Sequence, residues 1–106
     1  MRRRDVILAR VFFSDSPESK VRPAVVLSDE EYHTGDYVLI SPITTAGDDY
    51  CLQINDEDIN CPIEHGSGAR YDMVFRLHMK YAVRAIGKVT VEFHSKLVEN
   101  IISTLK

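Results

Sequence analysis

The chain has 106 residues, of which 44% are hydrophobic and 27% charged, and its formal net charge is −3. This length predicts one domain over residues 1–106, large enough to bury a core. No apolar run approaches the roughly 20 residues of a membrane-spanning helix, and the short apolar run after the basic start does not fit a signal peptide. Two cysteines are too few for a secreted disulfide framework. We therefore expect a cytoplasmic globular protein with no membrane contact.

The charges are strongly segregated along the chain. Residues 1–28 carry six Lys and Arg against three acids, residues 29–64 carry ten acids and no Lys or Arg, and residues 65–106 carry seven bases against three acids. The net charge argues against a generic nucleic-acid binder, but the local field decides how an anion is bound. The two ends of the chain can therefore still form a basic surface.

The first half of the chain predicts three strands rich in β-branched and aromatic residues. Turn-rich polar segments over 14–20 and 29–36 separate them, and an acidic turn follows the third strand. The predicted strands cover Asp5–Phe13, Val21–Ser28 and Tyr37–Thr45.

The second and third strands place an arginine beside a hydroxyl group. If they pair antiparallel so that Ser28 meets Tyr37, facing residue numbers add to about 65 and Arg22 lies within one register step of Thr44. Pro23 holds Arg22 extended at the start of its strand. A permanent guanidinium next to a hydroxyl predicts an anion site.

The second half predicts shorter strands and one helix. We expect strands over 50–54, 69–78 and 86–89, with a helical turn over 79–85 between the last two. Arg70, Asp72, Arg76 and His78 recur on one side of the 69–78 strand. Thr90 fits a helix N-cap, and apolar residues follow the helical period from Val91 to Leu105. Short strands, polar turns and one helix favour a small, partly closed β-barrel.

With these elements in place, the chain resembles the MazF/PemK family of toxin endoribonucleases. Val21–Ser28 (VRPAVVLS) is similar to the family's RPALVLS strand, Leu39–Thr45 (LISPITT) to its PITS strand, and Ile86-Gly87-Lys88 to its KKIGKL segment. Arg4-Asp5-Val6-Ile7 resembles the opening GDI, with Arg4 in place of the family's glycine. The 72–78 segment, DMVFRLH, departs from the family's DKIFTLD.

The resemblance implies a mainly β fold with a C-terminal helix, an SH3-like small β-barrel, and a homodimer that holds single-stranded RNA. It implies cleavage by the 2′-hydroxyl with no metal and no cofactor, and a cognate antitoxin with an acidic tail. Carried over by position, Arg22 and Thr44 form the catalytic pair. Lys20, Thr45, Arg70, Arg76, His78, Lys80 and Arg84 are the candidate RNA-binding residues.

Each of these assignments has an alternative. The basic set is equally consistent with a solvated face, the tyrosines can stack bases or pack, and His78 can act in proton transfer or be a packing residue. Cys51, Cys61 and His65 fit no standard zinc spacing. The altered 72–78 segment leaves open a catalytically degenerate barrel that binds RNA or protein. A CcdB-like gyrase inhibitor is a third possibility, although the chain lacks tryptophan.

Overall fold

The computed structural model describes residues 1–12, 19–29, 32, 36–45 and 49–106, so the turns predicted over 14–20, 29–36 and 46–49 lie wholly or partly outside the described residues. The described chain is mainly β with one C-terminal helix, as the sequence predicts. Its strands are β1 (Asp5–Phe12), β2 (Ser19–Val26), β3 (Tyr37–Thr44), β4 (Cys51–Gln53), β5 (Gly68–Arg70), β6 (Phe75–His78) and β7 (Ala82–Lys88). The helices are two short 3-10 turns, η2 (Asp56–Asp58) and η3 (Met79–Tyr81), and α1 (Val91–Leu105).

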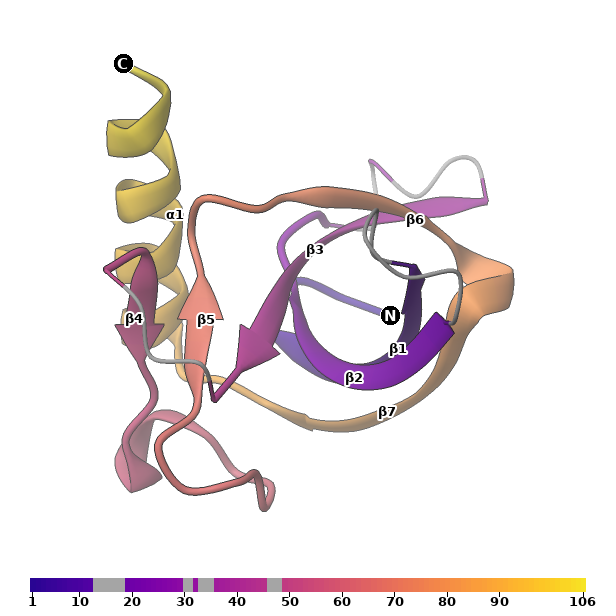
Figure 1. Ribbon diagram of the computed structural model, residues 1–106, viewed down its shortest axis with the longest axis horizontal. Coiled ribbons are helices and arrows are strands. Elements are labelled where there is room, and N and C mark those ends of the chain that lie inside the picture. The colour runs from indigo at the N-terminus through magenta and orange to yellow at the C-terminus, as the bar shows by residue number, and fades with distance from the viewer. Residues whose placement is uncertain (13–18, 30–31, 33–35, 46–48) are drawn as a thin grey trace.

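All strand pairs in the described sheet are antiparallel, in the order β4-β5-β3-β2-β1-β7, and β6 pairs with β3. The strands β1, β2, β3 and β7 curl around a common centre, and α1 stands beside β4 and β5 (Figure 1). Among the described helices, none is both long and apolar enough to cross a membrane.

The single strand predicted over 69–78 is wrong, because two strands, β5 and β6, take its place. Facing residue numbers add to 112 between β3 and β5 and to 115 between β3 and β6. Three extra residues therefore have to leave the ladder between the two pairings, and the chain bends there. Arg70 and Asp72 belong to the β5 side of this bend, whereas Arg76 and His78 lie on β6, so these four side chains do not form one row.

Two clusters of buried side chains lie on opposite faces of the sheet, as the two-residue period of a strand requires. Ile7, Ala9, Ala24, Val26, Val38, Ile40 and Leu77 pack inside the curl. Val6, Val25 and Ile43 face the other way and pack against Phe93 and Leu97 of α1. The helix therefore covers the outer face, and the open ends of the curl are left for polar residues.

The remaining boundaries differ from the predictions by a few residues. The helix begins where expected, because the Thr90 hydroxyl accepts a hydrogen bond from the Phe93 amide at 3.1 Å. The helical turn is shorter than predicted, and β7 takes over from Ala82. β2 begins at Ser19 rather than at Val21 and ends at Val26 rather than at Ser28. The β2–β3 ladder pairs Ala24 with Pro42, so facing numbers add to 66 rather than 65.

Candidate functional site

A pocket of about 280 Å³ opens where the start of β2 meets the end of β3. It brings together four of the residues singled out from the sequence, Lys20, Arg22, Thr44 and Thr45. The other lining residues are Val21, Pro23, Ile43, Glu64 and Ser67. The pocket therefore combines two cationic groups, hydroxyl groups and one carboxylate.

The strand ladders explain why Arg22 and Thr44 meet. Arg22 pairs with Ala9 on β1, and Ala24, two residues on, faces the interior of the curl. Continuing the β2–β3 ladder by two steps from the Ala24–Pro42 pair places Arg22 opposite Thr44 on the same face of the sheet. Arg22 is half-buried and its Nε atom is shielded from solvent.

Glu64 and Ser67 come from a distant segment that the sequence did not point to. Ser67 is buried and donates from its hydroxyl and its amide to the carbonyl oxygen of Glu64, at 2.5 and 3.2 Å. The amide of Ile54 donates to the Ser67 carbonyl at 3.0 Å, which ties this turn to the sheet. No local motif marks these residues, since only the tertiary fold brings them to Arg22.

A second group of predicted residues gathers in another pocket, of about 380 Å³. The Arg76 guanidinium lies 3.6 Å from the centre of the Tyr37 ring, and the Lys80 ammonium lies 5.1 Å from that of Tyr81. His78 packs edge-on against both tyrosines. Arg10, Val11, Phe75 and Leu77 complete the lining. We call this group the basic-aromatic pocket.

The two pockets adjoin across the β1–β2 ladder. Arg10 of the basic-aromatic pocket pairs with Val21 of the Arg22 pocket, and Val11 pairs with Lys20. His78 lies in the basic-aromatic pocket, where its Nδ1 accepts a hydrogen bond from the Lys80 amide at 3.1 Å. This hydrogen bond fixes the orientation of the His78 ring in the basic-aromatic pocket, and His78 does not line the Arg22 pocket.

Two predicted cations join neither pocket. Arg70 donates two hydrogen bonds to Asp72, at 2.9 and 2.7 Å, and this hydrogen bonding lowers the pKa of the Asp72 carboxyl below its usual range. Arg84 lies exposed on β7, where it pairs with Leu8 of β1. Both keep their predicted RNA-binding role only as a hypothesis.

Within the described residues, no cluster of His, Cys, Asp and Glu could hold a metal ion. Cys51 and Cys61 are both half-buried thiols, and burial raises the pKa of Cys61. Cys61 instead packs against Gly87, where an added Cβ would lie 2.6 Å from the Cys61 Cβ. Cys61 is therefore a packing residue against β7.

Comparison with known proteins finds a family and a fold. The family model described as the PemK-like, MazF-like toxin of type II toxin-antitoxin systems matches residues 2–105. No curated protein sequence matches the chain.

Three solved structures illustrate the fold. The Mycobacterium tuberculosis toxin MazF-mt6 superposes with a TM-score of 0.76 at 20% identity, covering 96% of each chain. A mycobacterial endoribonuclease in complex with its cognate antitoxin gives 0.76 at 15% identity, covering 99% of this chain and 92% of that one. The MazE-MazF complex of Deinococcus radiodurans (Form-II) gives 0.77 at 14%, covering 99% and 94%. At these identities the likeness shows a MazF-like fold, mainly antiparallel sheet with one C-terminal helix.

Proposed function

The chain belongs to the PemK-like, MazF-like toxin family of type II toxin-antitoxin systems, and from this premise we propose that it is an endoribonuclease that cleaves single-stranded RNA. The observation that carries the proposal is the meeting of Arg22 and Thr44 in one pocket. A fixed guanidinium and a hydroxyl at the rim of a sheet suit a phosphodiester.

The reaction proposed for this pocket is attack by the neighbouring 2′-hydroxyl on phosphorus. The bond from phosphorus to the 2′-oxygen forms, the bond to the 5′-oxygen breaks, and the products are a 2′,3′-cyclic phosphate and a 5′-hydroxyl. The 2′-hydroxyl loses one proton and the leaving oxygen gains one. Arg22 would stabilise the negative charge that builds up on the phosphorane oxygens, and Thr44 would donate a hydrogen bond that orients the phosphate.

A proton acceptor is needed for the 2′-hydroxyl, and Arg22 and Thr44 do not provide one at neutral pH. Glu64 lines the same pocket, and its carboxylate can accept a proton. We assign the proton-accepting role to Glu64 rather than to His78, which lies in the neighbouring pocket. Replacement of Glu64 by Gln would then lower kcat.

The basic-aromatic pocket supports a binding role for Arg76, His78 and Lys80. Cations beside aromatic rings suit the phosphates and bases of an unpaired strand, because phosphate attracts the cations and any base can stack on a ring. The strand would cross from this pocket to the Arg22 pocket over the β1–β2 ladder. We place the protein in the cytoplasm, as a homodimer that an antitoxin with an acidic tail would neutralise.

The test is digestion of labelled single-stranded RNA in EDTA. The natural chain should cleave, and Arg22→Ala should cleave roughly 100- to 1000-fold more slowly, which is the usual effect of removing one group that stabilises the transition state. Arg3→Ala, an exposed arginine paired with Asp29 outside both pockets, is the matched control and should keep full activity. Equal rates for the natural chain and Arg22→Ala would remove Arg22 from the mechanism. Salt-sensitive binding without cleavage would identify the degenerate RNA-binding alternative.

A further inference from the structure

A tight turn over residues 64–67 brings the Glu64 carboxylate to the Arg22 pocket. The Ser67 amide donates to the Glu64 carbonyl at 3.2 Å, and Gly66, the third residue of the turn, has a φ of 83°. A positive φ at the third position is the geometry of a type II turn. The first three residues of the turn are exposed, whereas Ser67 is only 3% exposed. The turn therefore projects from the sheet and is held to it at Ser67.

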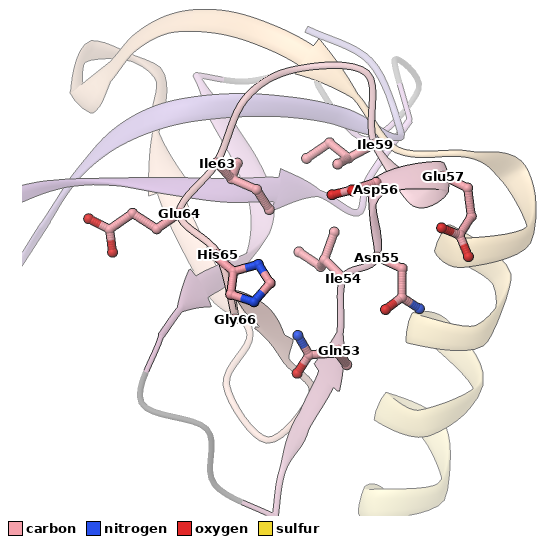
Figure 2. Close-up of a pocket in the computed structure, with 10 residues that line it drawn as sticks. All are labelled: Gln53, Ile54, Asn55, Asp56, Glu57, Ile59, Ile63, Glu64, His65 and Gly66. Atoms are coloured by element: carbon pink, nitrogen blue, oxygen red, sulfur yellow. The ribbon is translucent and has the colours of Figure 1, made fainter.

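The Glu64 side chain is directed toward the Arg22 pocket. Glu64 lines this pocket and also borders a larger one, of about 540 Å³, which is drawn in Figure 2. In that view His65 faces Gln53 and Ile54, whereas the Glu64 side chain points away from them. The Glu64 carboxylate is therefore turned out of the larger pocket and is available to the Arg22 pocket.

The backbone of the turn decides where this carboxylate lies. Within the described part of the chain, no hydrogen bond or ion pair holds the Glu64 carboxylate. A glutamate side chain without such a partner samples several rotamers. A reacting group has to be held close to its productive geometry by the groups that support it. For Glu64 that support comes from the turn.

The Ser67 hydroxyl supplies the shorter of the two hydrogen bonds that close the turn. It donates to the Glu64 carbonyl at 2.5 Å. The Ser67 carbonyl accepts a hydrogen bond from the Ile54 amide at 3.0 Å, and the next residue, Gly68, pairs with Thr44. Through Ser67, the Glu64 backbone is therefore held to the start of β5, the strand that faces Thr44.

A second buried serine holds the other end of β5. One step along the β3–β5 ladder, Arg70 lies opposite Pro42, which has no amide hydrogen to donate. The hydroxyl of Ser41, which is fully buried, donates to the Arg70 carbonyl. Ser41 does not line the Arg22 pocket. The two serines therefore make similar hydrogen bonds at the two ends of one strand, and only Ser67 borders the pocket.

We propose that Ser67 is a positioning residue for RNA cleavage, because its hydroxyl holds the Glu64 backbone where the carboxylate can reach the attacking 2′-hydroxyl. The inference rests on the proposed function, in which Glu64 accepts the proton. Ser67 acts through Glu64 and touches no reacting atom. Without the hydroxyl the turn keeps only the longer amide bond, so the carboxylate spends less time in the reactive position.

The first arm of the test measures kcat and KM for cleavage of single-stranded RNA. Ser67→Ala should lower kcat by about 10- to 100-fold, the size of effect that a small misplacement of a reacting group produces, and should leave KM within about twofold. In a Glu64→Gln chain, Ser67→Ala should lower kcat by less than about a further twofold, because the two residues act as a unit. Ser41→Ala is the matched control and should keep kcat. Urea unfolding compares the stability of the two serine variants.

The second arm needs no cleavage. Hydrogen exchange followed by NMR should show the protection of the residue 67 amide falling about fivefold in Ser67→Ala, as expected for the loss of one hydrogen bond, and unchanged in Ser41→Ala. Unchanged protection in Ser67→Ala would overturn the inference whether or not the chain cleaves RNA.

The remaining outcomes separate the inference from the proposed function. Full kcat in Ser67→Ala, an equal loss of kcat in Ser41→Ala, or an undiminished effect of Ser67→Ala in the Glu64→Gln chain would overturn the inference and leave Arg22 and Thr44 in place. Full kcat in Glu64→Gln would remove the proton-accepting role and the inference with it. No cleavage by the natural chain would refute the proposed function, and the exchange measurement would still decide whether Ser67 holds the turn.

Discussion

The backbone at Arg4 gives a sharp prediction about stability. The Asp5 amide donates to the Arg2 carbonyl at 3.0 Å, which closes a four-residue turn with Arg4 as its third residue. Arg4 has a φ of 79°, the left-handed conformation that a type II turn requires at this position and that glycine adopts without strain. The MazF/PemK family that the chain resembles has a glycine at this position. We therefore expect the arginine to lower the stability of the folded chain through its backbone conformation.

The size of that cost follows from a pair of variants. A residue with a Cβ costs roughly 1–2 kcal/mol in the left-handed region. Glycine elsewhere is about 0.5–1 kcal/mol worse than alanine, because it loses more freedom on folding. Arg4→Gly and Arg4→Ala both remove the hydrogen bond from Arg4 Nε to the Val89 carbonyl, so this effect cancels between them. We expect Arg4→Gly to be more stable than Arg4→Ala by about 0.5–1 kcal/mol.

Urea unfolding followed by circular dichroism measures the difference as a shift of the midpoint. The neighbouring Arg3 provides the control, because it has no positive φ and its ion pair with Asp29 is absent from both of its variants. There alanine should be the more stable replacement. If alanine is also the better replacement at position 4, the left-handed strain does not exist and the reasoning fails.

Three further predictions concern pH, packing and salt. Burial lowers the pKa of His94 below its usual value, so the unfolded chain binds the proton more tightly and stability should fall as the pH drops below about 6.5. His94→Leu should make the free energy of unfolding depend less on pH between pH 7 and 5.5. An unchanged dependence would exclude His94 as its source. Leu97→Ala, at a fully buried site, should lower the free energy of unfolding in urea by about 2–5 kcal/mol. A loss under about 1 kcal/mol would mean that the helix repacks. Arg76→Ala should reduce the slope of log affinity against log salt by about 0.7 for each RNA phosphate that is no longer neutralised. Asn55→Ala should leave the slope unchanged. Equal slopes for Arg76→Ala and the natural chain would place Arg76 off the RNA path.

The parts of the fold that the sequence predicts well are those with local causes. The Thr90 cap and the apolar period fix α1 within its own residues, and β2 has as its partner the strand that follows it in the chain. The prediction that Arg22-Pro23 marks the start of this strand is wrong, because β2 begins at Ser19. Because β2 and β3 follow each other in the chain and pair antiparallel, the sequence alone places Arg22 within one residue of the position opposite Thr44. The one-residue correction of that register matters, because it moves Thr44 from a position next to the residue facing Arg22 to the position directly opposite Arg22, on the same face of the sheet.

The parts that were missed have non-local causes. The break between β5 and β6 arises because β3 pairs with one of them at each end, and the spacing of residues 69–78 contains no sign of this. Glu64 reaches the Arg22 pocket only because Ser67 and Ile54 tie its turn to the sheet. A pattern search sees an isolated glutamate in an acidic block and has no reason to select it.

The fold also accounts for the uneven charge of the chain. The acidic block supplies Glu64 to the Arg22 pocket, while Lys20 and Arg22 come from the basic segment before it. The basic-aromatic pocket adds Arg10, Arg76 and Lys80, so a bound strand would meet positive charge along its backbone. A net charge of −3 is therefore compatible with RNA as the ligand.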